Sequence, residues 1–264
     1  MKIDLTGKTA LVTGSSAGIG RAIAQALAAA GARVVINGRR EAAVQDTLQA
    51  LRRELPAATL QGVAADVGTV PGCAALVRAV GDVDILVNNA GIFEAKDFFE
   101  IPDADWTRYF ETNVMSGVRL SRALMPGMLK RNWGRIVFIS SESGLYIPKE
   151  MIHYGFTKTA QLAISRGLAE LTAGTAVTVN SVLPGPTRSD GVEPFLQAMA
   201  RQSGVSPEAF ASEFVRQQRP TSLLQRFASV EEVANMVVYV SSPQASATNG
   251  AALRVEGGIV RTIA

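Results

Sequence analysis

The sequence TALVTGSSAGIG, residues 9–20, decides the fold. Its first four residues form an apolar run of strand length, and glycines follow at positions 14, 18 and 20. From Ile19 onward, apolar residues recur with the spacing of one helix face, until Gly31 ends the pattern at a position that glycine prefers. The stretch therefore predicts a strand, a glycine-rich turn and a helix.

A turn of this kind predicts a phosphate site. Glycine leaves room for backbone N–H groups to approach a pyrophosphate, and the helix N-terminus adds a partial positive charge. The spacing is Gly-x-x-x-Gly-x-Gly, whereas the commoner dinucleotide fingerprint is Gly-x-Gly-x-x-Gly. We expect a dinucleotide cofactor to contact Gly14, Ser15, Ser16, Gly18, Ile19 and Gly20.

The residues after the second predicted strand, residues 33–36, indicate which dinucleotide binds. An acidic residue at this strand end holds the ribose 2′-hydroxyl of NAD, whereas an arginine accommodates the 2′-phosphate of NADP. Arg39 and Arg40 follow the strand, and no carboxylate occurs before Glu41. The two arginines could instead lie on the solvent side of the next helix, but there they would oppose the helix dipole. We predict NADP(H), with Arg39 as the main contact and Arg40 as support.

Two further strand ends carry candidate cofactor contacts, which follow predicted strands at residues 60–65 and 83–87. They are Asp66, Val67, Asn89, Ala90 and Gly91. Asp66 either accepts a hydrogen bond from the adenine amino group or caps the next helix. Small residues after the fourth strand would let a cofactor pass close to the backbone. Asn89 could instead bond only to neighbouring turns.

The stretch from Ser141 to Lys158 predicts acid–base chemistry. Tyr154 and Lys158 are four residues apart and share one face of a predicted helix. A nearby ammonium lowers the pKa of a phenol from its usual value near ~10, so Tyr154 could exchange a proton with a substrate oxygen near neutral pH. Ser141 follows a fifth predicted strand, residues 136–139, and its hydroxyl could hold a carbonyl oxygen there. Taken alone, Tyr154 and Lys158 would be an ordinary helix pair.

A long helix is predicted from residue 103 to about residue 130, and Asn113 lies within it among apolar residues. A buried amide needs hydrogen-bond partners. Asn113 is therefore either a member of a structural network or part of a proton path.

The sixth predicted strand, residues 177–182, ends at another candidate contact. Pro184 and Gly185 follow it, and the hydroxyl of Thr187 could bind a nicotinamide carboxamide. Residues 188–227 mix apolar and charged side chains in an irregular pattern. Long segments at such a place are often lids over a site, although surface helices packed on the core are an equal alternative.

The order of the elements predicts the architecture. Five strand–helix alternations precede the sixth strand, which indicates an α/β fold of the Rossmann type: a doubly wound parallel sheet of about seven strands with helices on both faces. Ligands bind such sheets beyond the carboxyl ends of the strands, where every candidate residue falls. We predict one domain over residues 1–264.

Composition excludes several other classes of protein. The chain has 264 residues and a formal charge of +3, and its basic residues form short, separated pairs rather than the patch of a nucleic-acid binder. No apolar run approaches the ~18 residues of a membrane span. One cysteine, Cys73, and one histidine, His153, exclude disulfides within the chain and Cys- or His-rich metal sites. We expect a cytoplasmic protein with no metal, no nucleic-acid partner and no membrane.

Together these motifs resemble the short-chain dehydrogenase/reductase family over essentially the whole chain. The matching pieces are Thr13-Gly14-x-x-x-Gly18-Ile19-Gly20, Asn88-Asn89-Ala90-Gly91, Asn113, Ser141, Tyr154-x-x-x-Lys158 and Pro184-Gly185. The resemblance implies a catalytic tetrad of Asn113, Ser141, Tyr154 and Lys158. Tyr154 would be the acid in carbonyl reduction and the base in alcohol oxidation, and Lys158 would lower its pKa and hold the nicotinamide ribose. Ser141 would orient the substrate oxygen, and Asn113 would hold a water in the proton relay. A homo-oligomer, commonly a tetramer, is also implied, built on helices near residues 106–130 and 153–171.

The predicted function is the interconversion of a ketone or aldehyde and its alcohol with NADP(H). A 3-oxoacyl thioester reductase of the same family is the nearest alternative, and the long segment at residues 188–227 mildly favours a free carbonyl substrate. Enoyl reductases related to this family space the tyrosine and lysine more widely, so the resemblance disfavours reduction of a carbon–carbon double bond. A regulator that binds NADPH without turnover is the alternative from another class, although such proteins usually lose members of the tetrad.

Overall fold

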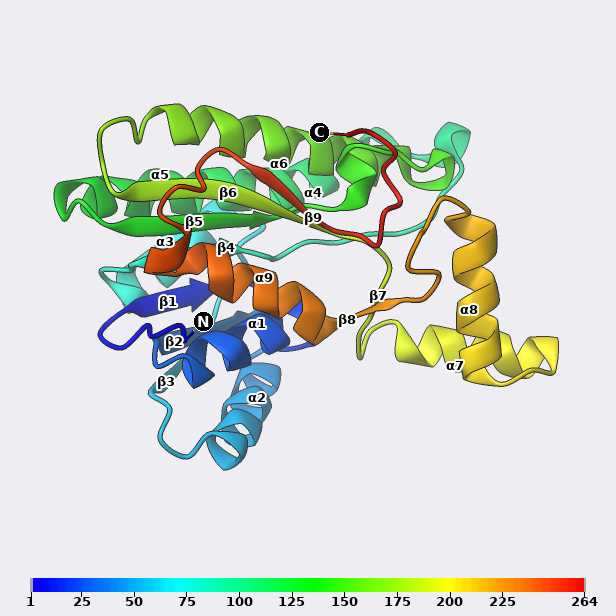
Figure 1. Cartoon of the computed structure of the whole chain (residues 1–264), viewed down its shortest axis with the longest axis horizontal. Coiled ribbons are helices and arrows are strands. Elements are labelled where there is room, and N and C mark those ends of the chain that lie inside the picture. Colours follow the sequence, from blue (N-terminus) through cyan, green and yellow to red (C-terminus); the bar gives the residue numbers. More distant parts are fainter. Residues whose placement is uncertain (1, 264) are drawn as a thin grey trace.

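A computed structural model gives the structure of residues 2–263, apart from the side chain of Phe195. Seven strands form one sheet in the order β3-β2-β1-β4-β5-β6-β9, and every neighbouring pair is parallel (Figure 1). The strands are β1 (Thr9–Val12), β2 (Arg33–Gly38), β3 (Leu60–Ala64), β4 (Ile85–Asn88), β5 (Gly134–Ile139), β6 (Val177–Pro184) and β9 (Ala252–Val255). The predicted doubly wound sheet is confirmed.

Helices cover both faces of the sheet because successive strand residues point to opposite sides. Val12 and its neighbours on one face pack against α1, α2 and α9, whereas Leu11 and its neighbours on the other pack against α3, α5 and α6. The helices are α1 (Gly18–Ala29), α2 (Glu41–Glu54), α3 (Val70–Val80), α4 (Asp103–Tyr109), α5 (Ser116–Lys130), α6 (Ile152–Glu170), α7 (Glu193–Ser203), α8 (Pro207–Gln218) and α9 (Val230–Ser241). Two cores thus enclose the sheet and leave its strand ends for the site.

The helix predicted over residues 103–130 is interrupted by a π-helical turn. α4 ends at Tyr109, the turn spans Phe110–Met115, and α5 continues from Ser116. Phe110 is exposed, whereas Asn113 and Val114 are buried. Turns of this kind occur mostly as single insertions within α-helices, often at functional sites, and this one carries Asn113.

The segment at residues 188–227 is helical rather than irregular. It contains α7 and α8, which Figure 1 shows to one side of the sheet, at the end to which β1 points. Two short strands, β7 (Thr187–Arg188) and β8 (Ala228–Ser229), pair in parallel where the segment leaves and rejoins the body of the protein. Ser229 then caps α9 in a capping box with Glu232. None of the helices in residues 2–263 is long and apolar enough to cross a membrane.

Candidate active site

The glycine turn between β1 and α1 has the form expected of a phosphate cradle. Gly14 and Gly18 have φ values of +61° and +55°, in the region that favours glycine. A Cβ at Gly20 would lie 2.4 Å from both the carbonyl oxygen of Gly14 and Nδ2 of Asn89, so only glycine fits. The first turn of α1 holds no acidic residue. These features fit a bound pyrophosphate, because the helix N-terminus stays open to an anion.

The serines of the turn bond to the protein itself. The Ser15 hydroxyl donates to the carbonyl oxygen of Val12 at 2.7 Å and accepts from the backbone N–H of Asn37 at 2.9 Å. Ser15 is fully buried, so its hydroxyl ties the turn to β2. The carbonyl oxygen of Ser16 accepts a hydrogen bond from the Thr47 hydroxyl on α2 at 3.0 Å. Ile19 lines a large cavity beyond the strand ends, which is called the main cavity below.

The end of β4 is fastened to the end of β1. Nδ2 of Asn89 donates to the carbonyl oxygens of Thr13 and Gly14 at 2.8 and 3.1 Å. The Thr13 hydroxyl accepts from the backbone N–H groups of Asn89 and Ala90, each at 3.0 Å. Asn89 therefore bonds to a neighbouring turn, as one of the two interpretations expected. Gly91, next along the chain, lines the same cavity.

Arg39 and Arg40 follow directly after β2. Both side chains are exposed, and within residues 2–263 the structure gives neither guanidinium a hydrogen bond or ion pair. A Cβ at Gly38 would lie 2.8 Å from the Ser16 hydroxyl, so this strand end lies against the glycine turn. Both arginines thus follow a strand end that lies against the glycine turn.

Asp66 does not cap the helix that follows it. Its carboxylate accepts from the backbone N–H of Gly68 at 3.0 Å, and Thr69 is the residue that caps α3. The capping interpretation of Asp66 is therefore wrong, because a threonine nearer to the helix makes the bond to Gly72 at 3.1 Å. Val67 is buried and its carbonyl oxygen accepts from Cys73, which is a packing residue.

Ser141, Tyr154 and Lys158 meet at the end of β5. Ser141 lies two residues after Ile139, the last residue of β5, and α6 carries the other two on one face. The Lys158 ammonium donates to the carbonyl oxygen of Ile139 at 2.8 Å and lies 5.5 Å from the centre of the Tyr154 ring. All three residues line the main cavity.

The acid–base properties of this group differ from the sequence prediction. Burial raises the pKa of Tyr154, the Glu142 carboxylate raises it further, and a hydrogen bond with Ser141 acts in the opposite direction. Burial also lowers the pKa of Lys158 to about 7, against the influence of Glu142. The expected lowering of the Tyr154 pKa by Lys158 is thus wrong for this structure, because burial disfavours the charged forms of both groups.

Asn113 belongs to a hydrogen-bonded network within the fold. Its side chain donates to the carbonyl oxygen of Ile92 at 2.9 Å and to the Thr157 hydroxyl at 3.0 Å, and it accepts from the backbone N–H of Ile92 at 2.8 Å. The amide therefore fastens the chain after β4 to α6. Its backbone carbonyl oxygen accepts from Gln161 at 2.6 Å.

The main cavity has a volume of about 700 Å³ and lies beyond the strand carboxyl ends. Pro184, Gly185 and Thr187 line it after β6. The backbone passes close to another segment there, since a Cβ at Gly185 would lie 2.9 Å from Glu256. The Thr187 hydroxyl donates to the carbonyl oxygen of Gly185 at 2.9 Å.

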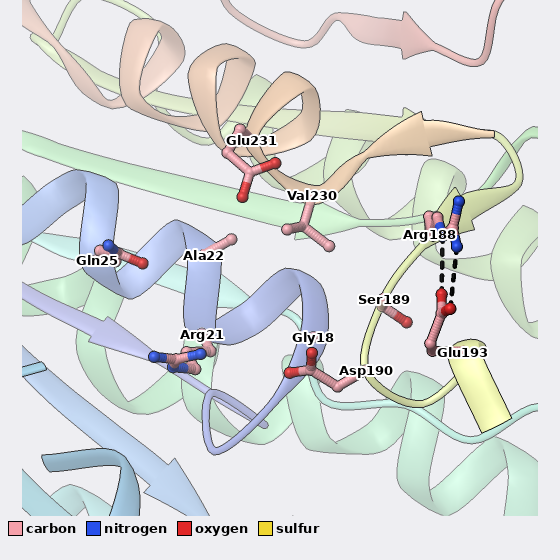
Figure 2. A pocket seen from close by; sticks show the side chains of 10 residues that line it. All are labelled: Gly18, Arg21, Ala22, Gln25, Arg188, Ser189, Asp190, Glu193, Val230 and Glu231. Atoms are coloured by element: carbon pink, nitrogen blue, oxygen red, sulfur yellow. Dashed lines mark hydrogen bonds and ion pairs between the residues drawn. The ribbon is translucent and has the colours of Figure 1, made fainter. Parts of the chain in front are cut away.

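A second cavity of about 280 Å³ lies between α1, α9 and the chain after β7 (Figure 2). Its two arginines are paired: Arg188 forms two hydrogen bonds with Glu193 at 2.7 and 2.9 Å, and Arg21 pairs with Glu54 at 2.8 Å. It contains none of the predicted catalytic residues. The larger cavity is therefore the candidate site. Among residues 2–263, no cluster of three or more His, Cys, Asp or Glu side chains is placed to hold a metal ion.

Comparison with known proteins identifies the family. The family model described as "short chain dehydrogenase" matches residues 8–200 of this chain. The chain belongs to the short-chain dehydrogenase/reductase family. An uncharacterized oxidoreductase of Bacillus subtilis, YvaG, is 50% identical over the full length of both chains. D-beta-hydroxybutyrate dehydrogenase of Cupriavidus necator is 33% identical, over 97% of this chain and 99% of its own.

A solved structure shows the same fold, and a further relative by sequence supports the same family. L-sorbose reductase of Gluconobacter frateurii, complexed with NADPH and L-sorbose, superimposes with a TM-score of 0.93 at 32% identity, and all of both chains is covered. A 3-oxoacyl-[acyl-carrier-protein] reductase of Escherichia coli is 34% identical, over 97% of this chain and 99% of its own. This short-chain dehydrogenase/reductase is therefore an oxidoreductase of the class that acts on alcohol and carbonyl groups.

Three residues at the site of this short-chain dehydrogenase/reductase were not found by sequence reasoning. Gln161 joins Lys158 to the carbonyl oxygen of Asn113, at 3.3 and 2.6 Å. Its position three residues after Lys158 on the helix was a usable signal. Glu142 and Arg219 form a buried ion pair beside Ser141, with Nε of Arg219 3.0 Å from a carboxylate oxygen.

Proposed function

We propose that the protein is an NADP(H)-dependent oxidoreductase that interconverts a ketone or aldehyde and its alcohol. The observation that carries this proposal is the meeting of Ser141, Tyr154 and Lys158 on one cavity, which Ile19 of the glycine turn and Gly91 also line. A bound nicotinamide would supply or accept the hydride.

We assign the proton transfer of the reaction to Tyr154. In reduction its hydroxyl protonates the carbonyl oxygen, and in oxidation its phenolate accepts the proton of the alcohol. Because burial raises the pKa of Tyr154, its hydroxyl is protonated near neutral pH, which is the form that reduction requires. Ser141 holds the substrate oxygen beside it. Lys158, whose pKa is about 7, can both give and take a proton near neutral pH and so resupply Tyr154.

We assign the cofactor to the strand ends around the glycine turn, from which Ile19 reaches the cavity. The backbone of the glycine turn would hold the pyrophosphate, and Arg39 would bind a 2′-phosphate with Arg40 in support. Asp66, Ala90 and Thr187 would contact the remaining groups. The exposed guanidinium of Arg39 and the NADPH named with a related structure support NADP(H) over NAD(H).

Substituting Tyr154 with phenylalanine tests the chemistry. Tyr154→Phe should abolish turnover of a carbonyl panel with NADPH, while the fluorescence titration with NADPH stays nearly unchanged. Tyr239→Phe, on α9 away from the cavity, is the matched control and should keep activity. Retained turnover in Tyr154→Phe would remove Tyr154 as the acid.

Substituting Arg39 with alanine tests the cofactor choice. Loss of a charged hydrogen bond costs about 1.5–3 kcal/mol, so NADPH binding should weaken roughly ten- to a hundredfold while NADH binding changes little. Arg53→Ala makes the same charge change at the far end of α2 and should alter neither titration. Equal weakening of both cofactors in Arg39→Ala would contradict the assignment.

The same substrate panel and NADPH titration distinguish the other candidate functions. The E. coli relative favours a 3-oxoacyl thioester, so that substrate belongs in the panel. Binding of NADPH with no turnover of any carbonyl would favour a regulator.

We further propose a cytoplasmic homo-oligomer, a tetramer or dimer. The exposed rings of Phe110 on the π-helical turn and Phe156 on α6 are stacked 6.4 Å apart and support this surface as the contact.

A further inference from the structure

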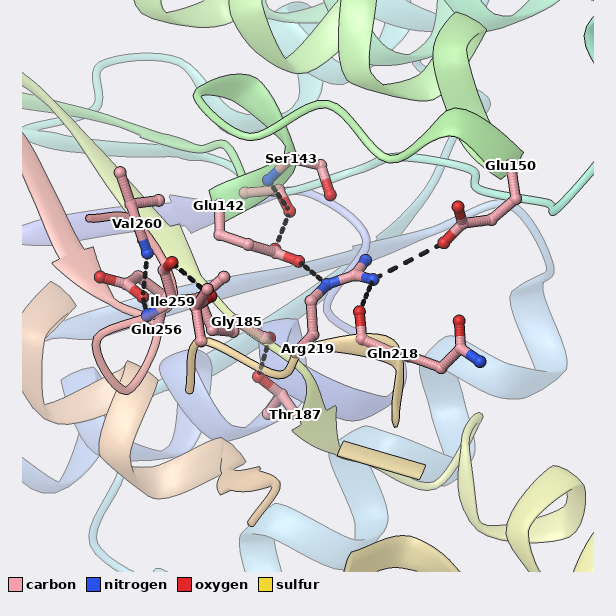
Figure 3. A network of polar contacts seen from close by, with 12 residues as sticks. Glu142, Ser143, Glu150, Gly185, Thr187, Gln218, Arg219, Glu256, Ile259 and Val260 are labelled. Carbon is pink, nitrogen blue, oxygen red and sulfur yellow. Dashed lines mark hydrogen bonds and ion pairs between the residues drawn. The ribbon is translucent and has the colours of Figure 1, made fainter. Parts of the chain in front are cut away.

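A buried ion pair lies beside the Ser141 hydroxyl and has no part in the mechanism above. Glu142 is 4% exposed and Arg219 is 8% exposed. One carboxylate oxygen of Glu142 accepts from Nε of Arg219 at 3.0 Å, and the other accepts from the Ser141 hydroxyl at 2.6 Å (Figure 3). Taking two charges out of water is costly, and this pair is buried in the wall of the main cavity. Their position suggests a role in substrate recognition.

The single hydrogen of the Ser141 hydroxyl links this pair to the reaction. Ser141 donates that hydrogen to Glu142 and accepts from the backbone N–H of Ser143 at 3.1 Å. A carbonyl oxygen can only accept, so Ser141 can hold it only when its hydrogen has turned away from Glu142. The carboxylate oxygen Oε2 of Glu142 is then buried without its donor, unless the substrate brings a donor of its own.

We infer that Glu142 selects carbonyl substrates that carry a hydroxyl on the carbon next to the carbonyl group. This inference rests on the proposed carbonyl chemistry. The substrate hydroxyl would donate to Oε2 of Glu142, while Ser141 turns its hydrogen to the carbonyl oxygen. Ser141 Oγ and Glu142 Oε2 are 2.6 Å apart, close to the usual O–H···O spacing of about 2.7 Å. Two neighbouring oxygens of one substrate therefore face two neighbouring oxygens of the protein.

Arg219 is a positioning residue in this arrangement. Its Nε holds one oxygen of Glu142, which leaves the other directed at Ser141, and its Nη1 donates to the carbonyl oxygen of Gln218 at 2.8 Å. Glu150 lies 3.6 Å from the same guanidinium. Two carboxylates thus share one guanidinium on this wall, which disfavours an anionic substrate. The expected class is neutral α-hydroxy ketones and aldehydes, including open-chain sugars.

The test compares two ketones that differ only at the proposed contact. In 3-pentanone a methyl group replaces the hydroxyl of 1-hydroxy-2-butanone. A buried acceptor left without its donor costs about 1–3 kcal/mol, which corresponds to about 5- to 150-fold, so the wild type should favour the hydroxy ketone by at least about fivefold in kcat/KM with NADPH. Equal kcat/KM values would overturn the inference and leave the carbonyl chemistry standing.

Variants then locate the preference. In Glu142→Gln, Arg219 should hold the amide oxygen, so the amide NH₂ faces Ser141 and the acceptor becomes a donor. The ratio of the two kcat/KM values should fall toward one. Glu150→Gln removes a carboxylate of the same wall that does not touch Ser141, and it should keep the ratio. Arg219→Met should lower the ratio and Arg219→Lys should restore part of it. An unchanged ratio in Glu142→Gln would contradict the assignment.

A binding measurement separates this inference from the proposed function. If the wild type reduces neither ketone, the reductase proposal fails for these substrates. Calorimetric titration of the NADPH-saturated protein with each ketone then decides the inference alone. Tighter binding of the hydroxy ketone, lost in Glu142→Gln, supports it, and equal binding of the two ketones overturns it. Should Glu142→Gln fail to fold, the wild-type comparison and Arg219→Lys carry the test.

Discussion

Replacing Lys158 with methionine should flatten the pH dependence of the protein's stability in mildly alkaline solution. Lys158 is 4% exposed, and burial lowers its pKa to about 7 from an ordinary value of 10.5. Between these two pKa values the unfolded chain binds more protons than the folded chain. The free energy of unfolding of the wild type therefore rises with pH across this window.

The size of the effect follows from the lowered pKa. A full proton difference changes the free energy of unfolding by about 1.4 kcal/mol per pH unit, and Lys158 is half protonated near pH 7. Between about pH 7 and pH 8.5 the wild type should gain roughly 1–2 kcal/mol. This interval avoids His153, whose lowered pKa acts below it, and Cys73 and Tyr154, whose raised pKa values act above it.

The assay is urea unfolding of the cofactor-free protein at fixed protein concentration, at several pH values in this interval. The wild type should become more stable with rising pH, and Lys158→Met should not. Lys130→Met, an exposed lysine at the end of α5, is the control and should follow the wild type. Parallel curves for wild type and Lys158→Met would refute the argument that this ammonium is disfavoured by burial.

Three further substitutions test other parts of the structure. Gly20→Ala should destabilise the protein by about 1–3 kcal/mol and weaken NADPH binding, because a Cβ there would lie 2.4 Å from the backbone oxygen of Gly14. Thermal unfolding measures this loss. The control is Gly167→Ala at an exposed helix position, where a Cβ has nothing within 4 Å, and this variant should keep the stability of the wild type. Arg135→Met should cost about 2–4 kcal/mol, since the buried guanidinium donates to the carbonyl oxygens of Ala176 at 2.8 Å and Ser242 at 3.4 Å; urea unfolding with a loss below 1 kcal/mol would speak against it. Phe156→Lys should lower the mass measured by light scattering if its exposed ring lies in the oligomer contact, and an unchanged mass would place that contact elsewhere.

The sequence was most informative where one physical pattern determines one structure. Alternating apolar runs and helical spacings predicted the parallel sheet, because each strand and helix must bury a face. Ser141, Tyr154 and Lys158 line one cavity because the first follows a parallel strand and the other two share one face of α6. Asn113, the fourth predicted catalytic residue, lies on the π-helical turn and is not among the residues that line this cavity. Tyr154 and Lys158 needed only their spacing to be placed together.

The sequence was least informative where partners lie far apart along the chain. Glu142 and Arg219 are separated by 77 positions, and neither forms part of a periodic pattern. Asn113, on the π-helical turn, bonds to residues 92 and 157, which are 21 and 44 positions away along the chain. The direction of the Tyr154 pKa shift depends on burial, which only a packed structure reveals.

The pairing of β7 with β8 has a consequence for how this enzyme can change. These two short strands bring together the two ends of the segment that carries α7 and α8, and the sheet and glycine turn are built without it. The entropy cost of closing a loop grows only slowly with its length. The segment can therefore lengthen or shorten at small entropic cost, provided that Arg219 still pairs with the buried Glu142. Substrate preference could be remodelled between β7 and β8 while the cofactor side stays constant.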